Sequence, residues 1–406
     1  MILNTQMKKD SFLKSGSYVL LAMVLSKAIA FILNILCAKY LDKSSFGQLS
    51  FIRNTAAMFE GIASGSNSNL VISSFGDRNY YSSVFLSYIV YSVLSIVIIT
   101  CFFYMSYGGF VLVDNYIYVF LILIFFSSCF LGMINSILIA SNSNKIMVIL
   151  SFYSGFISMI FCPVLIYNNN YNGALLAYTL YFSIDFIFKL YWVLKNKINR
   201  NASKIYFDIS ILKRSYKLLV YTGVSLVFFW YIRNELVVTE NGLAELAEFE
   251  LVYQFVTIAL IAVGAFTSTM LSKIGREEKI IRKTIFVGVF FSMATYFFSF
   301  LFGEKIFSAI NSSYDEINLL SPYVVFIVFP FTFNSIVNKV LVAYRVEYIS
   351  AYSSLLSVIG CFLLYHFYFS VNAVSLSLLY SVYYFLVSLF SLLWFFLNKT
   401  KTLNLQ

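Results

Sequence analysis

The chain has 406 residues, of which 60% are hydrophobic and 11% charged, and its formal net charge is +10. With a mean hydropathy of +0.83 it lies far outside the range of soluble globular proteins, which excludes a soluble enzyme or nucleic-acid-binding domain. Its apolar runs are long and unbroken, whereas membrane strands alternate over segments of about ten residues. An all-α integral membrane protein is therefore predicted.

A bilayer core takes about 20 apolar residues per helix, so a chain of this length accommodates about 12 spans. The first is expected to be an uncleaved span rather than a signal peptide, because its apolar run from Tyr18 to Ala38 is too long for a signal sequence. The twelve predicted spans are 16–38, 46–68, 81–105, 116–140, 146–167, 173–194, 216–238, 247–270, 284–303, 319–343, 349–370 and 374–397. Pro330, near the middle of the tenth, is expected to kink it.

A polar stretch at 195–217 divides the chain into two apolar halves. It holds seven basic residues and one acid, and six predicted spans lie on each side of it. The predicted organisation is a six-helix bundle at 1–194, a basic linker at 195–215 and a second six-helix bundle at 216–406. Spans one and seven both start on the same side of the membrane, as expected of a transporter built from two parallel repeats.

The basic residues are distributed unevenly between the predicted loops. With the N-terminus inside, the inner segments hold 20 Lys and Arg residues and the outer loops hold three. Lys and Arg favour the cytoplasmic side, so both termini and the linker are predicted to be cytoplasmic.

Eight ionisable residues fall inside the predicted spans, where charge is costly and usually functional. Five bases against three acids leave an excess of +2, which would attract an anionic group such as phosphate. The bases are Lys27, Arg53, Lys189, Arg233 and Lys339, and the acids are Glu60, Asp185 and Glu235.

Three of these bases are the candidates for a cationic cavity. Lys27 lies near the middle of the bilayer, where its side chain is too short to reach either surface easily. Arg53 and Glu60 are seven residues apart, which places them on one helical face about 10 Å apart, within reach of one cavity but not of each other. Arg233 could line the cavity or extend to the outer interface.

Asp185 and Lys189 have the i, i+4 spacing of an intrahelical ion pair, so they are candidates either for a self-neutralising pair or for a substrate contact. Glu60 or Asp185 could also couple transport to a cation gradient. Glu235 is two residues from Arg233 and points elsewhere, as expected at the outer edge. Lys339 is expected to extend to the cytoplasmic surface. The five cysteines lie singly in apolar runs, and no metal site, disulfide or cofactor is predicted.

The run SKAIAFILNILCAKYLDKSSFGQLSFIRN, from Ser26 to Asn54, resembles the start of Wzx-type O-antigen flippases of the multidrug/oligosaccharidyl-lipid/polysaccharide (MOP) exporter superfamily. The likeness extends loosely over the whole chain in length, span number, the basic linker and the segment YIRNE at 231–235. In this family two six-helix bundles form a V around a central cationic cavity. Basic residues of spans one, two and seven line that cavity, and Lys27, Arg53 and Arg233 occupy similar places.

The resemblance implies a transporter of the bacterial inner membrane and no enzyme. Its substrate would be an undecaprenyl-pyrophosphate-linked oligosaccharide, moved from the inner to the outer leaflet, with H⁺ or Na⁺ coupling as an option and membrane lipids and polysaccharide-assembly proteins as partners. Nucleic acid is not expected. A multidrug antiporter of the same superfamily remains an alternative. A Wzy-type polymerase usually has a large outer loop, which this sequence lacks, and Gly76-Asp77-Arg78 matches only a fragment of the major-facilitator loop motif.

Overall fold

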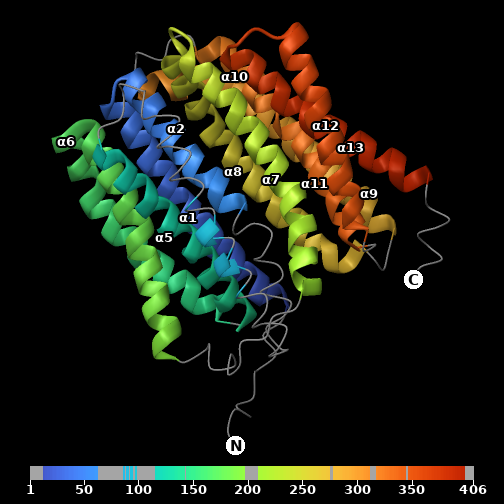
Figure 1. Cartoon of the computed structure of the whole chain (residues 1–406), viewed down its shortest axis with the longest axis horizontal. Helices are drawn as coiled ribbons and strands as arrows, with labels where there is room; N and C mark the ends of the chain where they lie inside the picture. Colours follow the sequence, from blue (N-terminus) through green and yellow to red (C-terminus); the bar gives the residue numbers. More distant parts are fainter. Residues whose placement is uncertain are drawn as a thin grey trace, which may run out of the picture.

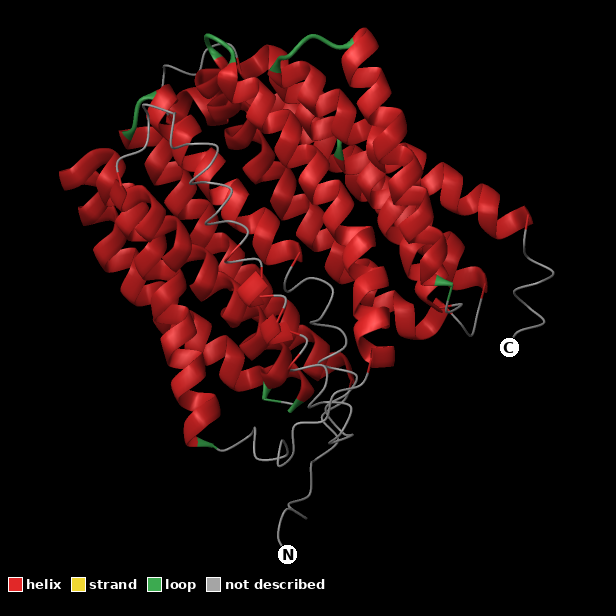
Figure 2. Cartoon of the chain, in the orientation of Figure 1, coloured by secondary structure: helices red, strands yellow, loops and turns green. Residues whose placement is uncertain are grey.

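A computed structural model describes residues 12–62, 86, 88–90, 92–94, 97, 115–141, 143–196, 209–274, 278–310, 317–343 and 346–397. Within these ranges every regular element is a helix and the connections are short turns (Figure 2). The helices are α1 (Phe12–Tyr40), α2 (Lys43–Glu60), α5 (Asn115–Ala140), α6 (Asn144–Lys195), α7 (Ile209–Val238), α8 (Gly242–Ile274), α9 (Glu278–Ile310), α10 (Ile317–Phe326), α11 (Val328–Ala343), α12 (Glu347–Tyr368) and α13 (Ala373–Leu397).

These helices match the predicted spans one, two and four to twelve. Five of the described helices are long and apolar enough to cross a membrane by length and composition. The predicted third span, 81–105, lies mostly outside the described residues, as does most of the linker. α6 ends at Lys195 and α7 begins at Ile209, so the last part of the predicted linker is the first turns of α7.

α6 contains the predicted fifth and sixth spans, and the chain reverses between them. Asn170 has φ 48° and ψ −123°, the positive-φ backbone of the first central residue of a type II′ turn, which residues other than glycine rarely adopt. Ser154 Oγ donates to Asp185 Oδ1 at 2.8 Å across the two arms. Gly173 lets the arms meet just beyond the reversal, because a Cβ there would lie 1.9 Å from the Leu165 carbonyl oxygen. Each arm is about 38 Å long, enough to cross a bilayer.

The kink predicted at Pro330 is confirmed as a break between α10 and α11. Proline has no N–H to donate to the carbonyl of Phe326, and its ring clashes with that carbonyl. The helix is interrupted at Ile327, a turn residue whose own N–H bonds to Val324 O at 3.2 Å. The tenth span is therefore two helical pieces.

The helices form two groups that meet along α2 and α8 (Figure 1). In the first group α1 and α5 pack on α6; in the second α7 packs on α12, and α11 and α12 pack on α13. The connections α1–α2 and α7–α8 lie at one end, here called the turn end, and Tyr40 contacts Tyr167 near the α6 reversal at that end. The end of α6 and the start of α7 lie at the opposite end.

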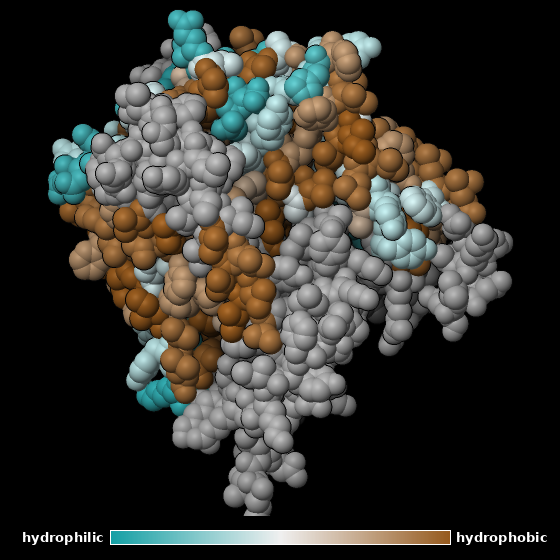
Figure 3. Space-filling view, viewed as in Figure 1, coloured by the Kyte–Doolittle hydropathy of each residue, from teal (hydrophilic) through white to brown (hydrophobic). Residues whose placement is uncertain are grey.

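Apolar side chains cover the flanks of the bundle, as Figure 3 shows, while polar residues gather at the turn end. Phe152, Phe156 and Phe161 on the first arm of α6 are 53% to 59% exposed. On α9, Phe290, at 66%, is more exposed still. Large apolar residues gathered and exposed at this level mark a surface that contacts lipid or another protein rather than water. This belt is consistent with a bundle embedded in a bilayer.

Candidate functional site

The two helix groups touch closely at the turn end, where α2 passes the start of α8. A Cβ on Gly47 would lie 1.9 Å from the carbonyl oxygen of Leu243, so only glycine permits this approach. Lys43 Nζ lies 2.6 Å from Glu248 Oε1, an ion pair that joins the two groups at this end. Asp42 caps α2 by accepting from the backbone N–H of Ser45 at 3.0 Å, and this bonding lowers the pKa of the carboxyl group.

Deeper in the same interface, Arg53 and Arg233 converge on one carboxylate. Arg53 Nη2 on α2 lies 3.0 Å from Glu250 Oε2, and Arg233 Nη2 on α7 lies 3.0 Å from Glu250 Oε1. Arg233 Nε also donates to Oε1, at 3.1 Å, and Asn54 Nδ2 donates to it at 2.8 Å. The Glu250 side chain is only 1% exposed. Arg53, Arg233 and Glu250 are here called the bridging cluster, and they carry a net charge of +1.

Arg53 is held in place from its own helix group. Its Nη1 donates to Asn34 Oδ1 on α1, and the hydroxyl of Tyr178 on α6 donates to the same oxygen. The guanidinium carbon lies 6.0 Å from the Tyr178 ring centroid. One nitrogen of Arg53 is thus fixed to α1 while the other reaches across to α8.

Arg233 is enclosed by aromatic rings of the second group. Its guanidinium carbon lies 5.6 Å from the Phe249 ring, 5.9 Å from Tyr253 and 5.3 Å from Tyr380. Phe229 stacks on Tyr380 with the centroids 3.6 Å apart and so supports that ring. Cation–π contacts are strongest where the cation is desolvated, and Arg233 is only 8% exposed. Arg233 therefore lies inside the bundle, and does not extend to the outer interface.

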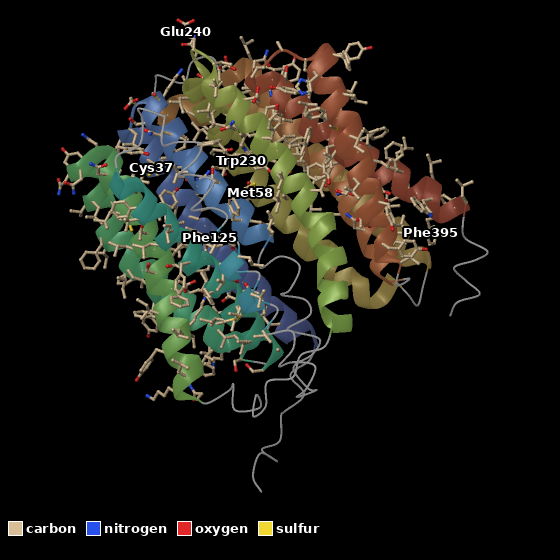
Figure 4. The ribbon with its side chains drawn as sticks, in the orientation of Figure 1. Cys37, Met58, Phe125, Trp230, Glu240 and Phe395 are labelled. Atoms are coloured by element: carbon tan, nitrogen blue, oxygen red, sulfur yellow. The ribbon has the colours of Figure 1, made fainter. Side chains whose placement is uncertain are left out.

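A hydrogen bond and an aromatic pair tie α2 to α7 beside the bridging cluster. Trp230 Nε1 donates to Thr55 Oγ1 at 2.9 Å, and its ring stacks on Phe51 at 6.2 Å. Figure 4 labels Trp230 within the bundle and, for comparison, Glu240 at the turn end, pointing away from it.

Asp185 and Lys189 form the intrahelical pair that their spacing predicts. Lys189 Nζ lies 2.7 Å from Asp185 Oδ2, and both side chains are at most 3% exposed. With Ser154 donating to the other carboxylate oxygen, the pair joins the two arms of α6. The ion pair and the hydrogen bond from Ser154 both lie within α6, so they do not bring Asp185 and Lys189 into the bridging cluster.

The remaining sequence candidates lie apart from the bridging cluster or outside what is described. Glu60 is half-buried at the end of α2, two turns beyond Arg53, and Glu235 is half-buried near the turn end of α7. The side chains of Lys27, in α1, and Lys339, in α11, are not among the described ones. Of the three bases predicted to line the cavity, Arg53 and Arg233 are thus the two that the described side chains bring together.

The sequence reasoning missed Glu250, which lies within the predicted eighth span, as does Glu248. Adding these two acids gives five bases and five acids, so the predicted intramembrane excess of +2 is wrong and the net charge of this set is zero. Glu250 could have been found from its position, because it lies eight residues after the start of α8, about 12 Å along the helix and inside an apolar span. Asn34 and Tyr178 carried no comparable signal.

No protein-family model and no curated protein matches the chain. Among solved structures, it matches an outward-facing multidrug resistance MATE family transporter of the MOP superfamily with a TM-score of 0.69 and 14% identity, covering 97% of both chains. The inward-facing form of such a transporter matches with a TM-score of 0.68 and 13% identity over 95% of this chain and 99% of that one. The fold is that of the MATE transporters.

A third match is a MOP superfamily transporter from Pyrococcus furiosus, whose binding pocket is described as reversed in polarity, suggesting a different function. It has a TM-score of 0.64 and 14% identity, and 96% of each chain is covered. The MATE fold confirms the predicted all-α architecture of twelve spans. At these identities the likeness establishes the fold alone.

Proposed function

We propose that this protein is a flippase that moves undecaprenyl-pyrophosphate-linked oligosaccharide units across the bacterial inner membrane by alternating access. The observation that carries the proposal is the convergence of Arg53 and Arg233 from opposite helix groups inside a transporter fold. Arginine binds phosphate oxygens in a bidentate manner, and two arginines facing one another across an interface suit a pyrophosphate.

In this mechanism the pyrophosphate enters between the two groups while the lipid tail stays in the bilayer. Arg53 and Arg233 bind it, together with Lys27 in the first span. One helix group then rocks against the other and exposes the site on the opposite side. With both termini and the linker in the cytoplasm, the turn end faces outward, and its close packing at Gly47 corresponds to an outer side that is shut.

The principal alternative within the same fold is a cation-coupled multidrug antiporter. A drug of that class that is cationic would meet a cluster with a net charge of +1, so the bridging cluster favours an anionic substrate. Glu60 and Asp185 remain the proposed positions for H⁺ or Na⁺ coupling. We propose no enzymatic step, and the test below separates a flippase from a polymerase.

The proposal is tested by removing the protein from its host and locating the lipid-linked intermediate that accumulates. Single repeat units on the cytoplasmic face support a flippase, whereas unpolymerised units on the outer face indicate a polymerase. Lys27→Ala and Arg53→Ala should each reduce surface glycan, and Lys27→Arg should retain more of it than Lys27→Ala. Full export by both Ala variants at normal protein level would overturn the cationic site.

A further inference from the structure

Glu250 occupies the position that an anionic ligand would take in the bridging cluster. Its two oxygens contact four nitrogens at 2.8 to 3.1 Å, supplied by Arg53, Arg233 and Asn54. Arg233 supplies two of these nitrogens, and Arg53 and Asn54 supply one each. Guanidinium and amide N–H donors of this kind also bind the oxygens of a phosphate. The carboxylate is therefore placed as an internal substitute for a phosphoryl group.

We infer that Glu250 is the specificity-determining counter-ion of the transport site, which an anionic ligand must displace before the two helix groups can separate. This inference rests on the proposed function and deepens it. It assigns to α8 a residue that competes with the substrate, in addition to the residues on α1, α2 and α7 that bind it.

Because the bridging cluster is buried, the helix groups part at low cost only if an anion takes the place of Glu250 beside Arg53. Arg53 and Asn54 belong to one helix group and Glu250 to the other, so these contacts break when the groups part at this level. Breaking a buried ion pair without replacing the lost partner leaves an unpaired charge in a poorly solvated site, which is strongly unfavourable. Arg233 stays paired with Glu250 in its own helix group, so Arg53 is the base left unpaired. An anion can compensate Arg53, whereas a neutral or cationic molecule cannot. Glu250 thereby restricts opening to anionic ligands.

The arginines remain positioned when Glu250 leaves. Arg53 keeps the bond from Nη1 to Asn34, and Arg233 keeps its contacts with Tyr253 and Tyr380. Displacement therefore uncovers a site whose donors are already oriented, and little rotamer entropy is lost on binding.

The test measures binding of geranylgeranyl pyrophosphate to the purified full-length protein in detergent, with geranylgeraniol as the uncharged probe. Glu250→Gln removes the competing charge and is expected to bind the pyrophosphate about tenfold more tightly. A gain of this size is expected if Glu250 leaves the site free in about one tenth of the wild-type molecules and the variant leaves it free in most of them. Arg53→Gln is expected to bind it at least about tenfold more weakly, through the loss of a charged hydrogen bond. Glu240→Gln removes an exposed acid at the turn end and should leave the affinity unchanged.

Each outcome decides the inference. If Arg53→Gln loses affinity while Glu250→Gln binds no more tightly than the wild type, the counter-ion role is wrong and the proposed function stands. If Arg53→Gln binds the pyrophosphate as tightly as the wild type, the anion site fails and the inference fails with it. If Glu250→Gln does not yield folded protein, Glu250→Asp, which keeps the charge but shortens its reach to Arg53, should bind the pyrophosphate more tightly; unchanged affinity would then overturn the role. Tighter binding of geranylgeraniol by either Glu250 variant would also contradict a charge-based exchange.

Discussion

Gly47 is predicted to set how closely the two helix groups approach at the turn end. In Gly47→Ala the new Cβ would lie 1.9 Å from the Leu243 carbonyl oxygen, whereas a C···O contact needs about 3.3 Å. The helices must part by about 1.4 Å to accommodate it. A shift of that size would stretch the contact between Arg53 and Glu250, now 3.0 Å, beyond hydrogen-bonding distance.

The cost of such overpacking is about 1 to 3 kcal/mol. If this cost destabilises only the conformation in which the turn ends are closed, the equilibrium between closed and separated turn ends shifts toward the separated one by about 5- to 150-fold. Spin labels at Ser44 and Glu240, both exposed, would report the distance between the two groups by pulsed electron paramagnetic resonance, in a variant without other cysteines. We expect a longer distance to gain population in Gly47→Ala.

Gly360→Ala is the matched control, because a Cβ on Gly360 would meet only Leu386, at an ordinary contact distance of 3.6 Å. It should leave the distance distribution unchanged. An unchanged distribution in Gly47→Ala, with the protein folded, would refute the idea that the turn ends are held together by this contact.

Three further predictions concern stability. Asp185→Asn leaves Lys189 buried without its counter-charge and should cost about 3 to 5 kcal/mol, seen as a lower melting temperature. The double variant with Lys189→Met should recover most of that loss; no recovery would indicate that the pair has another role. Trp230→Phe keeps an aromatic ring but removes the bond to Thr55, at a cost of about 1 kcal/mol by denaturant titration, and a loss near zero would show that the bond is not formed. Asp42→Ala should destabilise by about 0.5 to 2 kcal/mol at neutral pH. Because the folded-state pKa of Asp42 is lowered, its stabilisation is present above the unfolded-state pKa and is lost as the pH falls through the folded-state pKa, so the difference between variant and wild type should shrink in acid.

Hydropathy predicted the spans well because bilayer thickness fixes the length of an apolar helix. α12 and α13, for example, begin within two residues of their predicted starts. The spacing of Asp185 and Lys189 likewise predicted their ion pair, since a helix brings i and i+4 together.

The bridging cluster could be predicted only in part. Arg53 and Arg233 stand out as bases in apolar runs, but Glu250 lies near the start of its helix, where an acid resembles an ordinary loop residue. Arg53 and Glu250 are 197 residues apart in the chain, and no local pattern specifies that the two helix groups place them in contact. That contact depends on tertiary packing, including the close approach at Gly47.

The central claim is that this protein translocates a pyrophosphate-linked lipid through a site built by Arg53 and Arg233. The most direct measurement is translocation of an undecaprenyl-pyrophosphate-linked oligosaccharide across liposomes containing the purified protein. Wild-type protein is predicted to move the lipid-linked sugar, while Arg53→Gln and Arg233→Gln, reconstituted at equal density, are predicted to move little of it. Equal translocation by wild type and both variants, or none by folded wild-type protein, would contradict the account.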